Sequence, residues 1–342
     1  MSAEANTVPS SQEPLLEIRG LKKYFPVKGG VFLRTQAQLK AVDDVNLSIM
    51  PGETLGLVGE SGCGKSTLGK CVCRLHDPTD GSIHFKGTEI SALSGKSLKP
   101  FRRDIQMIFQ DPAESLNSRH SISSILEEPL IIHGIKSARE RRQRVLKILD
   151  TVGLASDALD RFPFEFSGGQ RQRIGIARAI SLNPQLIVCD EPVSALDVSV
   201  QSQILNLMLD LQTEFNLSYL FIAHDLAVVK HISDRIAIMY LGKIVELGPA
   251  DEIFKNPLHA YTKALISAIP VPEPGAIGDR ILLKGDVPSP IDPPPGCAFA
   301  RRSWIPCTEE EMSQPGEFKE VRPGHWVEVH PGTVENYKEL AS

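Results

Sequence analysis

The pattern of apolar residues predicts an alternation of short buried strands and helices. Continuous apolar runs at residues 53–58, 105–109, 186–189 and 220–223 are typical of buried strands. Helical periodicity follows the first run, at residues 67–75. The alternation of the two patterns indicates an α/β fold.

Helical patterning also fills residues 111–165, with an apolar run at 124–135 and a charged amphipathic run through Leu149. Because this segment is inserted between strands, it predicts a helical subdomain attached to the sheet. The arginines of residues 141–144 (RRQR) are typical of a solvated helix face.

The composition changes after Gly248, where proline becomes frequent. We therefore expect a disordered N-terminus at residues 1–14, a core at 15–250 and a proline-rich C-terminal extension at 251–342. A chain of 342 residues can bury one core of about 250 residues and still carry a tail.

A glycine-rich turn follows the first strand and has the sequence of a Walker A phosphate loop. Its residues are Gly59, Glu60, Ser61, Gly62, Cys63, Gly64, Lys65, Ser66 and Thr67. Glycines let backbone N–H groups face the phosphates, Lys65 adds a charge between the β and γ groups, and Ser66 offers a hydroxyl to Mg²⁺. The positive end of the following helix faces the same anion. The turn therefore predicts a nucleoside triphosphate site.

Further motifs identify the kind of NTPase. Residues 166–173 read FSGGQRQR and precede the strand that ends in Asp190 and Glu191. With this order of motifs, residues 15–250 resemble the ATP-binding cassette (ABC) family. The resemblance implies an ABC-type P-loop ATPase core with antiparallel β and helical subdomains. It also implies a dimer, in which the signature contacts the γ-phosphate on the partner's loop; the signature residues are Ser167, Gly168, Gly169 and Gln170.

The same resemblance implies the catalytic roles. Asp190 resembles the Walker B carboxylate that holds Mg²⁺, and Glu191 resembles the general base that polarises the attacking water. Adjacent residues at a strand end point in different directions, which suits this division. Gln110 resembles the Q-loop glutamine that senses Mg²⁺ and water. His224 resembles the switch histidine that contacts the γ-phosphate. The family's D-loop, which crosses the dimer interface, corresponds to Ser194, Ala195, Leu196 and Asp197.

The adenine platform is expected at the aromatic pair Tyr24 and Phe25, because family members stack the base on an aromatic residue before the first core strands. The alternative for each ring is hydrophobic packing. Residues 26–40 follow, and with two glycines and three basic residues they are typical of a surface loop that ends before a strand at Ala41.

The net charge of −5 argues against binding to nucleic acid, which requires a broad basic field. No apolar run approaches the roughly twenty residues that span a bilayer, and the first dozen residues lack the core of a signal peptide. We therefore expect a soluble intracellular chain. Its six scattered cysteines are typical of buried thiols in a reducing compartment.

The C-terminal extension narrows the resemblance. Residues 256–265 (NPLHAYTKAL) nearly match the NPLHPYT segment of peptide permease ATPases, with Ala260 in place of proline. Together with CDEPVSALDVS at 189–199 and IAHDLAVVKHISDR at 222–235, this segment makes the chain similar to the F-type ATP-binding subunits of bacterial oligopeptide and dipeptide permeases, over residues 15 to about 330.

This resemblance implies ATP-driven peptide import at the cytoplasmic face of the bacterial inner membrane, where the subunit would be peripheral. The implied partners are a second ABC ATPase subunit, in a heterodimer, two transmembrane permease subunits and an extracytoplasmic peptide-binding protein. A groove of the helical subdomain would receive a coupling helix from a permease. The run QDPAESLN supports this, because peptide importers carry the same residues there; a helix cap and turn is the alternative explanation. These residues are Asp111, Pro112, Ser115, Leu116 and Asn117.

The tail departs from the family. Many members ligate an iron-sulfur cluster with four cysteines, whereas this chain keeps Cys297 and Cys307 and has Ser303 and Val329 at the other two positions. We therefore expect no cluster, and a tail packed through Phe299, Trp304 and Trp326. A zinc site that adds His325 and His330 to the two thiols is the alternative, with irregular spacing.

Two other functions stay open. An importer ATPase for nickel, glutathione or another small solute would carry the same motifs. A translation or DNA-repair ATPase would usually add a second cassette, a coiled coil or a basic arm, and the sequence shows none of these.

Overall fold

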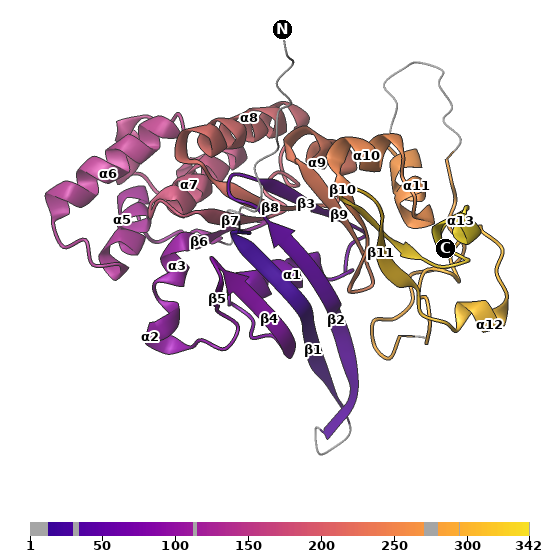
Figure 1. The fold of residues 1–342 in the computed structure, drawn as a ribbon. Helices are drawn as coiled ribbons and strands as arrows, with labels where there is room; N and C mark the ends of the chain where they lie inside the picture. The colour runs from indigo at the N-terminus through magenta and orange to yellow at the C-terminus, as the bar shows by residue number, and fades with distance from the viewer. Residues whose placement is uncertain (1–12, 30–33, 112–114, 270–279, 294, 342) are drawn as a thin grey trace, which may run out of the picture.

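The computed structural model describes residues 13–29, 34–111, 115–269, 280–293 and 295–341 (Figure 1). An eight-stranded sheet, in the order β11-β12-β10-β9-β3-β8-β7-β6, runs through the molecule. Its strands are β3 (Thr54–Val58), β6 (Ile105–Ile108), β7 (Leu186–Asp190), β8 (Ser218–Ala223), β9 (Arg235–Tyr240), β10 (Lys243–Pro249), β11 (Glu317–Arg322) and β12 (His325–Val329). The five strands from β9 to β6 are parallel and the remaining pairs antiparallel.

The parallel strands are covered on both faces, which is why they appear as continuous apolar runs. Successive side chains of β7 and β8 enter different cores: Val188 and Leu220 lie on one side, and Ile187 and Phe221 on the other. One core packs under helix α1 (Lys65–Val72). The other packs under α7 (Gly168–Ile180), α8 (Val198–Phe215) and α9 (Leu226–Ile232).

A second, antiparallel sheet has the order β2-β1-β4-β5. Its strands are β1 (Leu16–Gly29), β2 (Arg34–Ile49), β4 (Asp80–Phe85) and β5 (Thr88–Glu89). The prediction of a surface loop at residues 26–40 is wrong, because β1 and β2 pair through that stretch, with Val27 opposite Ala37. This part of the hairpin projects from the molecule (Figure 1) and is mostly exposed, so its sequence lacks an apolar face.

The helical subdomain contains α5 (Ile122–Ile132), α6 (Ala138–Thr151) and two 3₁₀ turns, η1 (Ser156–Asp160) and η2 (Pro163–Glu165); the short helices α2 (Gly95–Leu98) and α3 (Phe101–Asp104) precede β6. Arg142 and Arg144 are exposed, as expected for a solvated face. Arg141 instead bridges the two helices through an ion pair with Glu127, at 2.8 Å. Pro112, from the peptide-importer run, lies outside the described residues.

The C-terminal extension forms α10 (Ala250–Lys255), α11 (Ala260–Ser267), α12 (Glu309–Met312) and α13 (Tyr337–Ala341), and adds β11 and β12 to the main sheet. The sequence did not predict this addition, in which Val327 of β12 pairs with Glu246 of β10. Phe299 is buried against Tyr240, as expected of an anchor. Trp326 is not such an anchor, because it is 36% exposed and stacks on Phe318 at the sheet edge.

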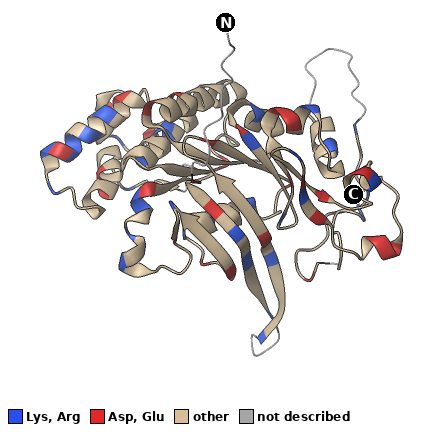
Figure 2. Ribbon diagram, viewed as in Figure 1, with Lys and Arg blue, Asp and Glu red and all other residues tan. Residues whose placement is uncertain are grey.

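Basic and acidic residues are scattered over the ribbon, most of which carries neither (Figure 2), so neither sign dominates the molecule as drawn there. Among the helices that the structure describes, none is both long enough and apolar enough to cross a membrane.

Candidate nucleotide-binding and catalytic site

The glycine-rich turn joins the end of β3 to α1, as the sequence predicts. Gly64 precedes the helix with φ 110°, and a Cβ atom there would lie 1.9 Å from the carbonyl oxygen of Ala41. A Cβ atom on Gly59 would lie 2.1 Å from the carbonyl oxygen of Met239. Close approach of neighbouring backbone therefore requires glycine at both positions.

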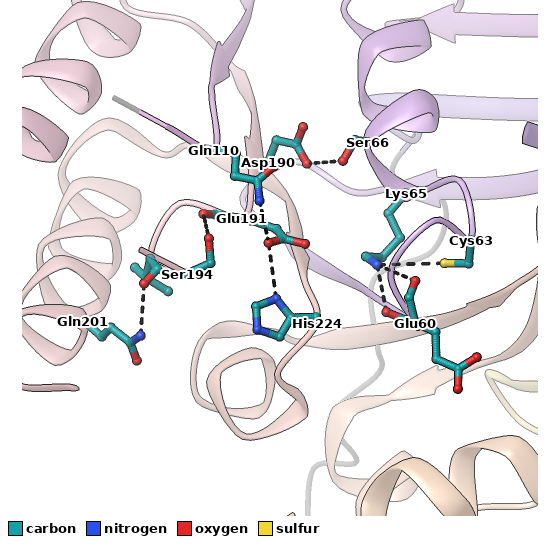
Figure 3. A network of polar contacts seen from close by, with 12 residues as sticks. Glu60, Cys63, Lys65, Ser66, Gln110, Asp190, Glu191, Ser194, Gln201 and His224 are labelled. Atoms are coloured by element: carbon teal, nitrogen blue, oxygen red, sulfur yellow. Dashed lines mark hydrogen bonds and ion pairs between the residues drawn. The ribbon is translucent and has the colours of Figure 1, made fainter. Parts of the chain in front are cut away.

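Lys65 folds back over this turn. Its side chain donates to the carbonyl oxygens of Gly59, at 2.8 Å, and Glu60, at 3.0 Å, and the residue is only 4% exposed (Figure 3). The ammonium group can exchange these carbonyl partners for the oxygens of a bound phosphate.

Ser66 and Asp190, two predicted Mg²⁺ ligands, are in contact. The hydroxyl of Ser66 donates to Oδ1 of Asp190 over 2.7 Å, and Asp190 is 4% exposed at the end of β7. Burial raises the pKa of Asp190, while the Ser66 hydrogen bond opposes this shift. One hydroxyl and one carboxylate are hard oxygen donors that suit Mg²⁺, which also takes ligands from phosphates and water.

Glu191 is the centre of a second cluster, with Gln110 and His224 (Figure 3). Its Oε2 atom accepts a hydrogen bond from Nε2 of Gln110, at 3.1 Å, and lies 3.2 Å from Nδ1 of His224. The backbone of Glu191 has φ 46°, a left-handed conformation that is costly for this residue type. Its N–H donates to the carbonyl of Ile222 in β8, over 2.9 Å, and this bond helps to fix the conformation.

The predicted catalytic residues therefore meet in space. Gln110, Glu191 and His224 follow three neighbouring parallel strands, whose carboxyl ends share one edge of the sheet. With Asp190, they line a cavity of 910 Å³. Lys70 of α1 also lines it, and the sequence analysis missed this residue because a lone helical lysine carries no motif.

The signature residues lie elsewhere. Among the described residues that line this cavity, none belongs to the signature; Gly168 instead lines a smaller hollow with Gln110 and Ala195. Ser167 caps α7 by accepting from the N–H of Gln170, at 3.3 Å, so the segment is a helix cap as well as a motif. Three of the four residues are exposed: Ser167, Gly168 and Gln170.

The predicted D-loop leads into α8, where Asp197 is the N-cap. Its carboxylate accepts from the N–H of Val200 at 3.0 Å, and this hydrogen bond lowers the pKa of Asp197. Gln201 fixes the loop by donating to the carbonyls of Val193 and Leu196, both at 3.0 Å. No sequence signal pointed to Gln201, since it binds main-chain carbonyls that every residue type offers.

Comparisons with known proteins agree with this geometry. Residues 42–194 match the ABC transporter family model, and residues 245–308 match the model of the oligopeptide/dipeptide transporter C-terminal region. The chain is 54% identical over 326 residues to the oligopeptide transport ATP-binding protein AppF of Bacillus subtilis (strain 168), covering 94% of this chain and 98% of that protein. This chain belongs to the ATP-binding proteins of ABC transporters.

Other similar proteins give the same family. The chain is 52% identical to the dipeptide transport ATP-binding protein DppF of Haemophilus influenzae, over 88% of this chain and 92% of that one. The dimeric cassette MJ0796, solved in a post-hydrolysis state with ADP and Pi, has a TM-score of 0.61 and 30% identity, over 69% of this chain and 98% of that chain. The resemblance inferred from the motifs is confirmed, and the protein is an ABC ATPase.

The two aromatic candidates for adenine in this ABC ATPase occupy different places. The hydroxyl of Tyr24 bonds to Asp43, whose N–H donates to Gly242, and the N–H of Gly242 donates to Cys63 of the phosphate loop. Phe25 packs edge-to-face on His76, beyond the far end of α1, with ring centroids 5.6 Å apart.

The residues of the tail do not form the donor set of a four-iron cluster. All six cysteines of the chain are free thiols. Burial raises the pKa of Cys297 and Cys307, which disfavours the thiolate that iron binds. The two candidate zinc histidines are engaged elsewhere: Nε2 of His325 lies 2.8 Å from Oε1 of Glu246, and that of His330 lies 2.8 Å from the carbonyl of Glu311. The described residues hold no group of three or more His, Cys, Asp or Glu that could bind a metal ion.

We predict that Lys65→Ala weakens ATP binding by about tenfold or more, because it removes the buried charge at the phosphate loop. Equilibrium titration of the purified full chain with Mg-ATP measures the effect. Lys147→Ala is the matched control, because Lys147 is exposed on α6. An unchanged dissociation constant for Lys65→Ala contradicts the assignment of the phosphate lysine.

Proposed function

We propose that the chain powers the import of peptides through a membrane transporter, as one half of a nucleotide-binding dimer. The observation that carries the proposal is the position of the signature. Asp190 and Glu191 line the cavity, and Asp190 bonds to Ser66 of the phosphate loop, whereas the signature is mostly exposed and lies outside that cavity. A second chain can therefore bring its own signature to the bound nucleotide. The peptide transport functions named for AppF and DppF support the substrate class.

Within each half-site, Lys65 exchanges its carbonyl partners for phosphate oxygens, and Ser66 and Asp190 would hold Mg²⁺. When bound, Mg²⁺ would supply positive charge against the charge that develops on the phosphates. Glu191 accepts a proton from the attacking water, which Gln110 and His224 orient from either side of the carboxylate. Placement and charge neutralisation supply most of the catalysis in phosphoryl transfer, so the separated half-sites have little activity.

Tyr24 is the better candidate for the adenine platform. It connects to Cys63 of the phosphate loop through Asp43 and Gly242, whereas Phe25 packs beyond the opposite end of α1. The base of a nucleotide whose phosphates lie on the loop would reach Tyr24 first.

The helical subdomain offers a surface to a permease subunit. Ile131 and Ile132 are 54% and 55% exposed on α5 and line a hollow of 440 Å³ together with Glu127, Glu128 and His120. Exposed aliphatic residues beside carboxylates suit an amphipathic helix that carries basic residues. We propose that a coupling helix of a permease docks here, at the cytoplasmic face of the membrane.

The full assembly would contain a second ABC ATPase subunit, two permeases and a peptide-binding protein. The deciding experiment is purification of the chain from membranes, followed by mass spectrometry of the ligand held by the co-purified binding protein. Peptides are the expected ligand. A nickel complex, glutathione or another small solute would identify a different importer, and the absence of permeases would contradict a role in transport.

In the same purification, Ile131→Asp is expected to lose the permeases while keeping ATP affinity, because a buried carboxylate opposes docking in an apolar hollow. Leu282→Asp is the control, since Leu282 is 76% exposed on the C-terminal extension. Equal recovery of permeases with both variants would contradict docking at α5.

Glu191→Gln is expected to keep ATP binding and to lower the rate of hydrolysis by about 10² to 10⁴, since the amide preserves shape but cannot accept the proton. The measurement is ATPase activity of the assembled transporter, with the exposed Glu214→Gln as control. Activity within twofold of wild type would rule out Glu191 as the base.

Tyr24→Ala is expected to weaken ATP binding about tenfold through the loss of base stacking, whereas Phe25→Ala changes it little. Tyr24→Phe keeps the ring but not the hydrogen bond to Asp43, and is expected to bind nearly as tightly as wild type. Competition between ATP and GTP measures the part of the nucleotide affinity that depends on the base. A larger effect at Phe25 would reverse the assignment.

Protein purified without oxygen is expected to be colourless, with well under one iron per chain, because serine and valine stand at two of the four ligand positions. Cys297→Ser is then expected to leave transport nearly intact. Stoichiometric iron and sulfide, with broad absorption in the visible blue, would overturn this prediction.

A further inference from the structure

We infer that the C-terminal extension completes the phosphate loop, with Arg302 as a positioning residue that acts through Glu60. These residues are 242 positions apart in the chain. Nη1 of Arg302 donates to Oε2 of Glu60 over 2.9 Å, and Nη2 donates to Oε1 over 3.3 Å. The guanidinium and carboxylate therefore meet as two parallel hydrogen bonds, an arrangement that fixes direction as well as distance.

A second contact holds the backbone of the same loop residue. The N–H of Glu60 donates to the hydroxyl of Tyr261 in α11, over 2.8 Å, and Tyr261 is fully buried. The carbonyl of Glu60 accepts from Lys65. Residues of the extension thus hold the side chain and the amide of Glu60, while its carbonyl supports the phosphate lysine.

The two anchors on the extension are themselves rigid. The side chain of Arg302 is 9% exposed and its guanidinium lies over the ring of Tyr240, 5.8 Å from the centroid. Phe299 packs against both Tyr240 and Tyr261, and its carbonyl accepts from the N–H of Arg302 at 2.8 Å. Because these groups are fixed by packing, little freedom is lost when they hold the loop.

The contact also neutralises a carboxylate close to the expected phosphates. Glu60 places a carboxylate in the loop that binds a polyanion, and its side chain is only 31% exposed. Without Arg302, the charge of Glu60 would repel the phosphates. The loop would also lose the two hydrogen bonds that fix the side chain of Glu60. With Arg302, the pair is neutral and the loop is held in the form that Lys65 requires.

The inference rests on the proposed ATP-binding role of the phosphate loop, so both are tested on the full chain by Mg-ATP titration. Arg302→Gln is expected to weaken ATP binding by about five- to twentyfold. Arg301→Gln is the matched control and is expected to change binding less than twofold, because Arg301 is 44% exposed and contacts only the exposed Glu309, at 3.8 Å, among the ion pairs of the described residues.

A charge effect is separated from a loss of folding by two further measurements. Glu60→Gln combined with Arg302→Gln removes both charges and is expected to recover most of the lost affinity. The loss of ATP affinity in the single variant Arg302→Gln is expected to become smaller as the salt concentration rises, since screening weakens the repulsion between Glu60 and the phosphates. In the assembled transporter, KM for ATP rises while kcat stays within about threefold, because the base Glu191 is untouched.

Arg302→Lys keeps the charge but not the paired hydrogen bonds, and an intermediate affinity is expected. If Arg302→Gln does not fold, the binding measurement is made with Arg302→Lys instead. Binding by both Arg302 variants within twofold of wild type, or a double variant no better than Arg302→Gln, would overturn the inference while leaving ATP binding by the loop intact. Loss of the Lys65→Ala effect would instead overturn the proposed site itself.

Discussion

The parallel pairing of β3, β8, β7 and β6 is the constraint on which the rest of the molecule depends. Parallel strands bring their carboxyl ends to one edge, and the phosphate loop, Asp190, Glu191, His224 and Gln110 all follow those ends. Residues from four separate parts of the chain therefore meet without any covalent link. β8 accepts a hydrogen bond from the N–H of Glu191 in its left-handed conformation, so the sheet also helps to fix the orientation of this residue.

The sequence was sufficient for the parts of the fold that repeat a physical pattern. Buried parallel strands appear as apolar runs, and the phosphate loop needs glycine where backbone atoms come within contact distance, as at Gly59 and Gly64. Family motifs named Gln110, Asp190, Glu191 and His224, all of which line the cavity. They could not predict Lys70, because its place depends on which face of α1 meets the cavity.

Other elements could not be predicted because their contacts are non-local. The outer part of the β1–β2 hairpin, at residues 26–29 and 34–40, is mostly exposed, so this part of the hairpin shows no apolar face. Strand β12 is defined by its pairing with β10, some eighty positions away in the sequence. Trp326 lies on that strand but is 36% exposed and stacks on Phe318 of β11, which its residue type alone does not indicate.

The pairing of β12 with β10 changes how a shortened chain should be understood. Removal of the extension would expose β10 as an open sheet edge, with unpaired N–H and C=O groups that can join another chain. It would also leave Glu246, which is fully buried beside His325 and the N–H groups of Leu258 and His259, as a carboxylate without those partners. Aggregation of such a fragment would therefore report a damaged sheet, and would give no information about whether the extension regulates transport.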